Sequence, residues 1–528
     1  MNETGELILG LAVAIAALST IARLINVPYP IVLVIGGLGI GLVPGLPDVT
    51  LDPDLVLVIF LPPLLYAAAF FASLRDLRRD LRAISMNAIG LVIATAVGVA
   101  IVAHALIDGM TWGAAFALGA IVAPTDPIAA TAITRRLGAP RRIINVIEGE
   151  SLINDGTALV IYRSAVAAVV GGSFSIWSGG LDFIVAAVGG VAMGLLVGGA
   201  IAEVRRRIED TPVEITISLA TGYAAYLPAE AIHVSGVLAA VTAGVYLGWK
   251  APEIASVTQR LQGRPVWELL QFLLNAILFV LIGLQLPVVV GELDAISAWT
   301  LLGYAAAICA AVVGVRLIWI NTTPYLIRAL DRRPEQRARR ADWRFRMIAV
   351  WAGMRGAVSL AAALALPLQT DAGEPFPQRD LIIFLAFSVI LFTLLVQGLT
   401  LPWLLRRLQV CDDGREEAEE EIHARLHTAS TALVRLDELA EEDWTRDDTV
   451  DRARRLYEYR QRRFGAQRDG EDSDGIEDRS LAYQRLAREL FDAQRRALVD
   501  LRNRGEISNE VMVRIERELD LEDSRLEI

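Results

Sequence analysis

Long apolar stretches recur along the chain as far as about residue 404, and the pattern then stops. A bilayer core about 30 Å thick takes roughly 20 apolar residues per helical span, so each stretch predicts a transmembrane helix. We expect thirteen spans, at roughly 6–25, 28–46, 54–72, 84–107, 112–134, 143–169, 178–202, 213–230, 233–249, 265–290, 297–322, 345–368 and 380–405. Of the 528 residues 54% are hydrophobic, which is too apolar for a soluble protein of this size. The pattern therefore predicts an all-α polytopic membrane domain over residues 1–404.

Basic residues concentrate in every second loop between these spans. The loops after odd-numbered spans carry Arg or Lys, as in "RDLRRDLR" (75–82) and "RRLGAPRR" (135–142), whereas the other loops carry acids and almost no bases. Positively charged loops stay in the cytoplasm. We therefore expect a plasma-membrane protein with its N-terminus outside and its C-terminus in the cytoplasm. An odd number of spans also fits two inverted six-helix repeats joined by a seventh helix.

The sixth predicted span contains carboxylates that a membrane helix normally lacks. Asp155 lies roughly 12 residues, or about 18 Å of helix, into the bilayer, which is close to the midplane. A charge there costs several kcal/mol unless it faces a water-filled cavity, an ion or a partner charge. Helical geometry predicts two neighbouring polar faces, one formed by Glu148, Ser151 and Asp155 and the other by Glu150, Asn154 and Thr157. A purely structural ion pair remains an alternative, more for Glu150 than for Asp155.

The fifth predicted span, "IVAPTDPIAATAI" (121–133), holds two prolines. Pro124 and Pro127 remove backbone donors and leave carbonyls without helical partners inside the membrane. Asp126 followed by Pro127 is the N-cap and N1 arrangement that starts a new helix. The sequence therefore predicts a broken helix whose freed carbonyls suit a hard cation such as Na⁺. A proline kink that serves only packing is the alternative.

The twelfth predicted span, "WAGMRGAVSLAAALALP" (351–367), places Arg355 between Gly353 and Gly356. An arginine inside the membrane needs a buried anion or the negative end of a half-helix. Glu150 is the most economical anion in the sequence, so we expect a Glu150–Arg355 ion pair.

Three motifs in this order, "APTDP", "GESLINDG" and "GMRGAVSL", resemble those of the cation:proton antiporter 1 family, the sodium/proton exchangers of bacteria and animals. The resemblance covers roughly residues 6–405. It implies two crossed discontinuous helices, a core part that carries the ion, and a second part that forms a homodimer. One departure is that many members have an acid in the third span, where this chain reads Ala67, Ala68 and Ala69.

The resemblance also implies roles for individual residues. Asp155 is the carboxylate that binds the ion and the proton, with Ser151, Asp126 and Thr125 around it and Na⁺ held at Asp155, Ser151 and Thr125. Glu150 pairs with Arg355, and Asn154 stands where electrogenic relatives have Asp. The implied function is electroneutral exchange of a monovalent cation, first of all Na⁺, for H⁺ by alternating access. A K⁺/H⁺ antiporter of the same fold is the alternative, and a cation channel and an intramembrane aspartyl protease are distant ones.

Other classes of function find no support in the sequence. No Walker-type glycine-rich loop precedes a Lys and a hydroxyl residue, so we expect no nucleotide coupling. We expect no enzyme activity, no cofactor and no nucleic-acid partner, while membrane lipids surround the spans.

Several further polar residues lie within predicted spans. Glu268 follows helical spacing with Gln271 and Asn275, which fits either an access funnel, together with Glu148, or contacts between the core and dimer parts. We expect Arg316 to reach back to the membrane surface.

Residues 405–528 have a different character. They hold 23 Arg and 33 Asp or Glu, a net charge of −10 out of −11 for the whole chain. Leucines at helical spacing predict several amphipathic helices, and "GAQRDGEDSDGIED" (465–478) resembles a charged linker. This tail is predicted to be a cytoplasmic helical bundle that aids dimerisation or a regulatory domain with an unidentified partner.

Overall fold

A computed structural model describes residues 3–43, 53–171, 176–291, 293, 296–330, 342–410, 414–469 and 475–526. The chain divides into two compact units, Met1–Asp412 and Asp413–Ile528. Within the described residues the elements are all helices, and one isolated antiparallel bridge joins Gln369 to Pro375. The predicted all-α fold is therefore confirmed. The boundary between the units lies after Asp412, whereas the sequence placed it after residue 404.

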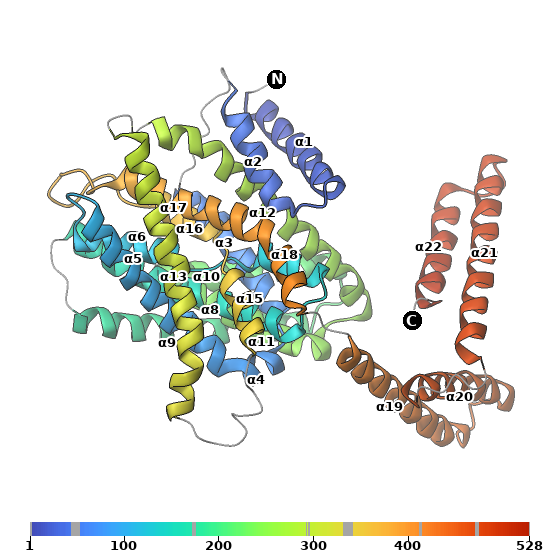
Figure 1. Cartoon of the computed structure of the whole chain (residues 1–528). Coiled ribbons are helices and arrows are strands. Elements are labelled where there is room, and N and C mark those ends of the chain that lie inside the picture. The colour runs from blue at the N-terminus through green and yellow to red at the C-terminus, as the bar shows by residue number, and fades with distance from the viewer. Residues whose placement is uncertain are drawn as a thin grey trace. The chain divides into compact units, whose positions relative to one another are not determined.

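The first unit is a bundle of helices (Figure 1). It contains two short π-helical segments, η1 and η2. In chain order the elements are α1 (Glu3–Leu24), α2 (Tyr29–Gly41), α3 (Pro53–Phe70), α4 (Leu74–Ser85), η1 (Met86–Leu91), α5 (Val92–Leu106), α6 (Trp112–Val122), α7 (Pro127–Arg136), α8 (Arg141–Val170), α9 (Ile176–Arg205), α10 (Thr211–Ala231), α11 (Gly236–Ile254), α12 (Val257–Gly291), α13 (Ala298–Leu330), α15 (Trp343–Trp351), α16 (Ala357–Leu364), α17 (Arg379–Phe392), η2 (Thr393–Gln397) and α18 (Gly398–Leu408).

Seven helical stretches among the described residues are long and apolar enough to cross a membrane. They are Leu74–Leu106, Trp112–Arg136, Arg141–Val170, Ile184–Arg205, Val257–Val289, Ala298–Ile327 and Arg379–Leu408. Shorter apolar helices cover Leu9–Leu24, Tyr29–Gly41 and Val58–Phe70. These findings confirm a bundle of membrane-spanning character, while the count of thirteen spans stays a prediction.

Two of the predicted spans are interrupted. The fifth is divided into α6, which ends at Val122, and α7, which begins at Pro127. Asp126 is the N-cap of α7, and its Oδ1 accepts a hydrogen bond of 2.9 Å from the Ile128 backbone N–H. The twelfth is divided into α15 and α16, with non-helical backbone around Arg355. The break predicted from Pro124 and Pro127 is thus present, and so is a second interrupted helix, which the family resemblance implied.

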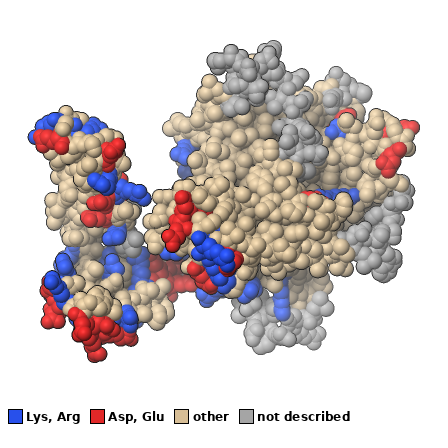
Figure 2. Space-filling model, turned by 180° about the vertical axis from the view of Figure 1, so that it is seen from behind, with Lys and Arg blue, Asp and Glu red and all other residues tan. Residues whose placement is uncertain are grey.

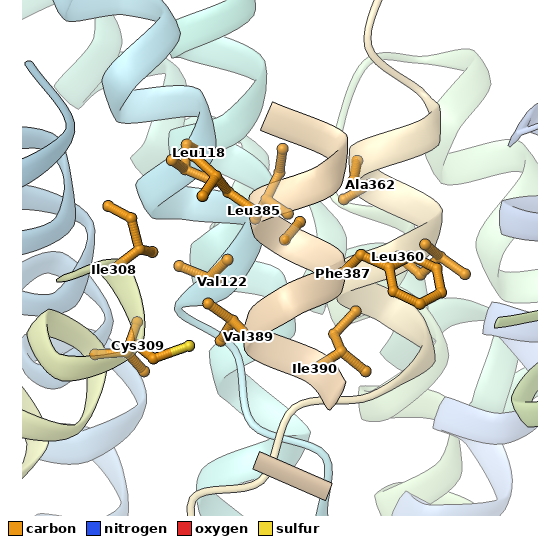
Figure 3. Packing of buried hydrophobic residues seen from close by; sticks show 14 of the residues in the cluster. Leu118, Val122, Ile308, Cys309, Leu360, Ala362, Leu385, Phe387, Val389 and Ile390 are labelled. Atoms are coloured by element: carbon orange, nitrogen blue, oxygen red, sulfur yellow. The ribbon is translucent and has the colours of Figure 1, made fainter. Parts of the chain in front are cut away.

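Helices α6 and α16, one half of each interrupted span, are anchored in an apolar core. Figure 3 shows side chains of α17 in the middle of this packing, with α6, α13 and α16 around them. The residues labelled there are Leu118, Val122, Ile308, Cys309, Leu360, Ala362, Leu385, Phe387, Val389 and Ile390. Because such a core is close-packed, it holds the broken helices at a defined position relative to α17.

Helices α2 and α12 approach each other closely at two glycines. A Cβ added to Gly37 would lie 2.3 Å from the Val280 carbonyl oxygen, and one added to Gly283 would lie 2.2 Å from the Val34 oxygen. Small residues at such crossings let helix backbones approach within a membrane. The pair is therefore joined by backbone proximity rather than by large side chains.

The second unit consists of α19 (Arg415–Ala440), α20 (Asp447–Asp469), α21 (Ile476–Asn503) and α22 (Asn509–Leu526). Helix α19 packs against α20, and α21 packs against α22. The face of the molecule in Figure 2 carries acidic and basic side chains at high density on this unit, whereas much of the first unit is uncharged. The amphipathic helices predicted for the tail are present. Part of the predicted linker, residues 470–474, lies outside the described residues.

Candidate functional site

The two breaks in the helices meet each other in space. The Asp126 backbone N–H donates a hydrogen bond of 2.8 Å to the Met354 carbonyl oxygen. The Arg355 Nε donates one of 3.0 Å to the Val122 carbonyl oxygen. These two bonds hold the segment between α6 and α7 against the segment between α15 and α16, so the discontinuous helices cross at their non-helical parts.

At the break between α6 and α7, a charged side chain compensates the dipole of each helix end. Val122 is the last residue of α6, so its carbonyl lies at the negative end of that helix dipole, and the Arg355 guanidinium binds there. Asp126 caps the positive N-terminus of α7. The Arg355 side chain also donates to the Gly353 carbonyl, and its backbone N–H donates to Thr393 Oγ1 at 3.0 Å. The arginine thus satisfies carbonyls that the break leaves without helical partners.

The glycines on either side of Arg355 make room for charged side chains. A Cβ on Gly356 would lie 1.8 Å from Asp126 Oδ2, and a Cβ on Gly353 would lie 2.5 Å from Arg316 Nε. Any larger residue would displace the charged group that packs there. This close approach is a physical reason for glycine at both positions.

Glu150 pairs with a different arginine from the one that the sequence predicted. Its carboxylate accepts hydrogen bonds of 2.5 and 3.2 Å from Nη1 and Nη2 of Arg316, and both side chains are only 3% exposed. Asn87 Nδ2 donates to the same carboxylate at 3.2 Å. The predicted Glu150–Arg355 ion pair is therefore wrong. So is the prediction that Arg316 reaches the membrane surface, since Arg316 is buried and bidentate.

Thr125 connects the broken helix to α8. Its carbonyl oxygen accepts a bond of 2.9 Å from Ser151 Oγ, and its Oγ1 accepts one of 2.9 Å from Asn154 Nδ2. The Thr125 hydroxyl in turn donates to Glu150 Oε1 at 3.3 Å. The structure thus brings Thr125, Ser151, Asn154 and Glu150 together. Asn154 Oδ1 is buried without a hydrogen-bond partner among the described residues.

Asp155 faces a cavity of about 480 Å³. Its side chain is buried, with 6% exposure, and no described residue donates a hydrogen bond to it or forms an ion pair with it. The cavity is also lined by Asp126, Ser151, Thr125 and Ser359. A buried carboxylate without a protein partner is costly in the charged form. This arrangement can therefore hold a cation or a proton at Asp155, with oxygen donors from the neighbouring residues.

The predicted funnel residues lie at the same cavity. Glu148 pairs with Arg135 at 2.7 Å, and Glu268 pairs with Arg264 at 2.9 Å. The side chains of all four are partly or largely exposed. The cavity lining also includes Gln271 and Asn275, as well as Ala67 and Ala68 from the segment where the family resemblance implied an acid. Glu148 and Glu268 therefore both lie on the cavity lining, the position that the access-funnel alternative predicts.

Sequence reasoning missed several contributors to the site. Asn87 donates to Glu150 from η1, Ser359 lines the cavity from α16, and Tyr29 lines it from the start of α2. Ser359 lies within the "GMRGAVSL" motif, so its position after Gly356 was an available signal. Asn87 and Tyr29 come from other spans, and only the tertiary structure brings Asn87 to Glu150 and Tyr29 to the cavity. Among the described residues, no group of three or more His, Cys, Asp or Glu side chains forms a metal cluster.

Several known proteins are similar to this chain in sequence. A family model described as "Sodium/hydrogen exchanger, transmembrane" matches residues 10–407. The Na(+)/H(+) exchanger Rv2287 of Mycobacterium tuberculosis is 38% identical over 527 residues, which is 98% of this chain and 95% of the relative. The Na(+)/H(+) antiporter ApNhaP of Aphanothece halophytica is 33% identical, over 81% of this chain and 78% of the relative.

A solved structure has a similar fold. The sodium proton antiporter MjNhaP1 from Methanocaldococcus jannaschii aligns with a TM-score of 0.58 and 19% identity, over 77% of this chain and 99% of that chain. At this identity the similarity supports the fold alone.

Proposed function

The chain belongs to the sodium/hydrogen exchanger family, and on this premise we propose that it is a secondary active antiporter that exchanges Na⁺ for H⁺. It is a multi-pass membrane transporter and not an enzyme. The ion and the proton compete for one carboxylate, Asp155. The observation that carries this proposal is that Asp155 is buried, lines the cavity and has no hydrogen-bond or ion-pair partner among the described residues.

The residues around Asp155 provide the oxygen ligands that Na⁺ prefers. Ser151 Oγ and the Thr125 carbonyl lie within 2.9 Å of each other, and both residues line the cavity with Asp155. We assign Na⁺ to Asp155, Ser151 and Thr125. Asp126 adds negative potential from the N-terminus of α7, while Asn154 positions Thr125 through the bond to its hydroxyl. When a proton replaces Na⁺, it neutralises the Asp155 carboxylate and removes the electrostatic attraction for the cation.

Competition at this carboxylate couples the two fluxes. An empty, charged Asp155 is costly to move through the membrane, so the site crosses only when it carries Na⁺ or H⁺. Each inward step with one ion is then matched by an outward step with the other. Movement of the broken-helix core relative to the rest of the bundle exposes the site to alternate sides. Glu150 does not take part in the exchange because Arg316 compensates its charge.

The same proposal includes the orientation of the protein in the membrane and its assembly as a homodimer. Arg-rich loops after the predicted odd-numbered spans support a plasma-membrane protein with its N-terminus outside and its acidic tail in the cytoplasm. The transporter works as a homodimer. Labelling of single cysteines near each terminus with a membrane-impermeant reagent, in intact cells and in inside-out vesicles, tests the orientation. Labelling of the tail in intact cells would contradict it.

The central test is Asp155→Asn measured in inside-out vesicles by fluorescence dequenching on addition of Na⁺. We expect no Na⁺-dependent proton flux, because an amide can neither lose a proton nor neutralise a cation. Asp108→Asn is the matched control, since Asp108 is exposed and does not line the cavity. Wild-type flux with Na⁺ and none with K⁺ would favour the Na⁺ assignment over the K⁺ alternative. Appreciable Na⁺-dependent flux from Asp155→Asn, at wild-type amounts in the membrane, would refute the proposal.

A further inference from the structure

Helix α21 carries two apolar seams, and only one of them is packed within the described chain. Ala487, Phe491 and Leu498 form the first seam and are buried against α22. The second seam lies on an adjacent face and consists of Tyr483, Leu486, Leu490, Ala493 and Ala497. Its large members are exposed by 64% for Tyr483, 58% for Leu486 and 54% for Leu490. The first seam folds the hairpin, and the second has no partner within the described chain.

The second seam has the spacing of a coiled coil. Its residues follow one another at intervals of three, four, three and four positions, which is the a/d pattern of a heptad repeat. Large side chains occupy its first half and alanines its second half. Because a heptad seam packs knobs into the holes of a facing helix, this pattern points to a helix as the partner.

We propose that this seam pairs with α21 of a second copy of the chain in an antiparallel arrangement. In this register Leu490 faces Ala493 of the second copy, and Leu486 faces Ala497 of the second copy. The two leucines thus each meet an alanine, whereas Tyr483 at the end of the seam lies opposite Asp500 of the second copy. The arrangement is symmetric about a two-fold axis, so each contact occurs twice.

Charge complementarity supports the same register. Glu489 and Arg496 flank the seam at equivalent heptad positions, and neither forms an ion pair within the part of the chain that the structure describes. Antiparallel pairing places Glu489 of one copy beside Arg496 of the other, twice per dimer. By contrast, Arg495 on another face is already bound to Asp492, Asp520 and Asp523 at 3.1, 2.8 and 3.0 Å.

A parallel pairing fits the same residues less well. It would place each leucine, Leu486 and Leu490, opposite the same leucine of the second copy. Ala493 and Ala497 would likewise each face the same alanine of the second copy. The helices would then be held apart at one half of the seam and leave gaps at the other. Glu489 and Arg496 would no longer face each other. The sequence of the seam therefore favours the antiparallel orientation.

Disulfide trapping in the full-length protein tests the orientation. Two differently tagged copies, each with Cys309→Ser and Cys411→Ser, are co-expressed in membranes, one with Leu486→Cys and the other with Ala497→Cys. We expect efficient disulfide formation between the two tagged chains under mild oxidation. The matched control combines Leu486→Cys in both copies, where antiparallel pairing separates the cysteines by 11 positions, or about 16 Å of helix.

The outcomes of this experiment are distinct. Cross-linking of the 486/497 pair with several-fold less in the 486/486 pair supports the proposal. Equal or stronger cross-linking of the 486/486 pair indicates parallel packing and overturns it. Absence of cross-linking in both combinations also overturns it and shows that another part of the chain, or nothing, covers the seam. The readout is independent of ion exchange, so it does not depend on the function assigned to Asp155.

Charge exchange across the seam provides the second test. Glu489→Arg alone and Arg496→Glu alone each place like charges together, and each is expected to lower the yield of the 486/497 disulfide several-fold. The double variant Glu489→Arg/Arg496→Glu restores the yield, because opposite charges meet again. Arg485→Glu, an exposed site away from the seam, is the control that leaves the yield unchanged. Failure of the double variant to recover would contradict the proposed register.

Discussion

Two buried arginines near the site have different roles because different groups surround them. Arg316 meets the carboxylate of Glu150 in a bidentate pair. Arg355 lies at the last carbonyl of α6 and satisfies a helix terminus instead. Removing one partner of a buried ion pair leaves an uncompensated charge, whereas a cation at a helix terminus is stabilised by backbone dipoles. The two arginines should therefore couple differently to Glu150.

A double-mutant cycle at Glu150 tests this difference. We expect Glu150→Gln and Arg316→Met each to lower the free energy of unfolding by about 3–5 kcal/mol, because each leaves the other charge buried and unpaired. The double variant should recover part of the loss. Arg355→Met combined with Glu150→Gln should recover less of the loss, because Arg355 binds backbone carbonyls and forms no ion pair with Glu150 within the described residues. Thermal unfolding in detergent measures all of these, and additive losses for Glu150 and Arg316 would show that this pair contributes no coupling.

The contact between Gly356 and Asp126 gives a second residue-scale prediction. Gly356→Ala would place a Cβ 1.8 Å from Asp126 Oδ2, so the carboxylate or the chain crossing must move. We expect a strong loss of Na⁺-dependent proton flux in vesicles. Gly314→Ala in α13 is the control, because nothing lies within 4 Å of its added Cβ, and it should retain wild-type flux. Normal flux from Gly356→Ala would mean that the position of Asp126 is not critical.

At the scale of elements, glycines determine how closely the helices pack. Gly37 of α2 and Gly283 of α12 bring the backbones of these two helices together. Gly244 of α11 lies equally close to α3, since a Cβ added to it would be 2.7 Å from the Tyr66 carbonyl oxygen. Within a bilayer the hydrophobic effect does not drive helices together, so close van der Waals packing provides much of the association energy. These crossings therefore hold the bundle around the site.

Enlarging one of these glycines should separate α2 from α12. We expect Gly283→Val to destabilise the protein by about 1–3 kcal/mol, the usual cost of overpacking, because its Cβ alone would overlap the Val34 carbonyl. Gly303→Val in α13 is the matched control, since the space around Gly303 is open. Melting temperatures in detergent give the comparison. Equal melting temperatures for the two variants would argue against a close α2–α12 contact.

At the scale of the whole molecule, the balance of charge decides how transport responds to membrane potential. Glu150 is paired with Arg316, and Asp126 caps α7, so both are compensated in their charged forms. Asn154 carries no proton to exchange. Asp155 is then the group that alternates between Na⁺ and H⁺. A carboxylate that leaves with one ion and returns with the other moves no net charge across the membrane.

We therefore expect the rate of exchange to change little with an imposed potential. One net charge per cycle would contribute about 2.3 kcal/mol per 100 mV, which would alter the rate markedly. Proteoliposomes clamped with K⁺ and valinomycin, with Na⁺ as substrate, provide the measurement. A rate that changes several-fold with potential would show that a second group, such as Asp126 or Glu148, also exchanges a proton. Asn154→Asp adds a carboxylate beside the site and tests whether a second titratable group makes the exchange rate depend on the membrane potential.

The sequence alone determined the helical architecture and the position of the break between α6 and α7. Apolar length sets where a helix can cross a bilayer, and Pro124 and Pro127 remove the hydrogen bonds that would continue one. Helical periodicity placed Ser151 and Asp155 on one face of a helix and Asn154 on the adjacent face, and the Asp126–Pro127 pair identified a helix cap, because both features involve residues close along the chain. These features depend on local backbone geometry, which the order of residues encodes directly. The meeting of Asp126 with Asp155 was implied by the family resemblance.

Only the tertiary structure decided which distant groups meet. Arg316 and Arg355 are both arginines within apolar segments, and nothing in their local sequence distinguishes a partner in α8 from a partner at the end of α6. The choice depends on the rotation of α13 and on the crossing of two breaks more than two hundred positions apart, as in the bond from Arg355 to Val122. Such contacts arise from packing of whole helices, whose relative positions are set by many residues together. The ion pair of Glu150 therefore became identifiable only when those helices were assembled.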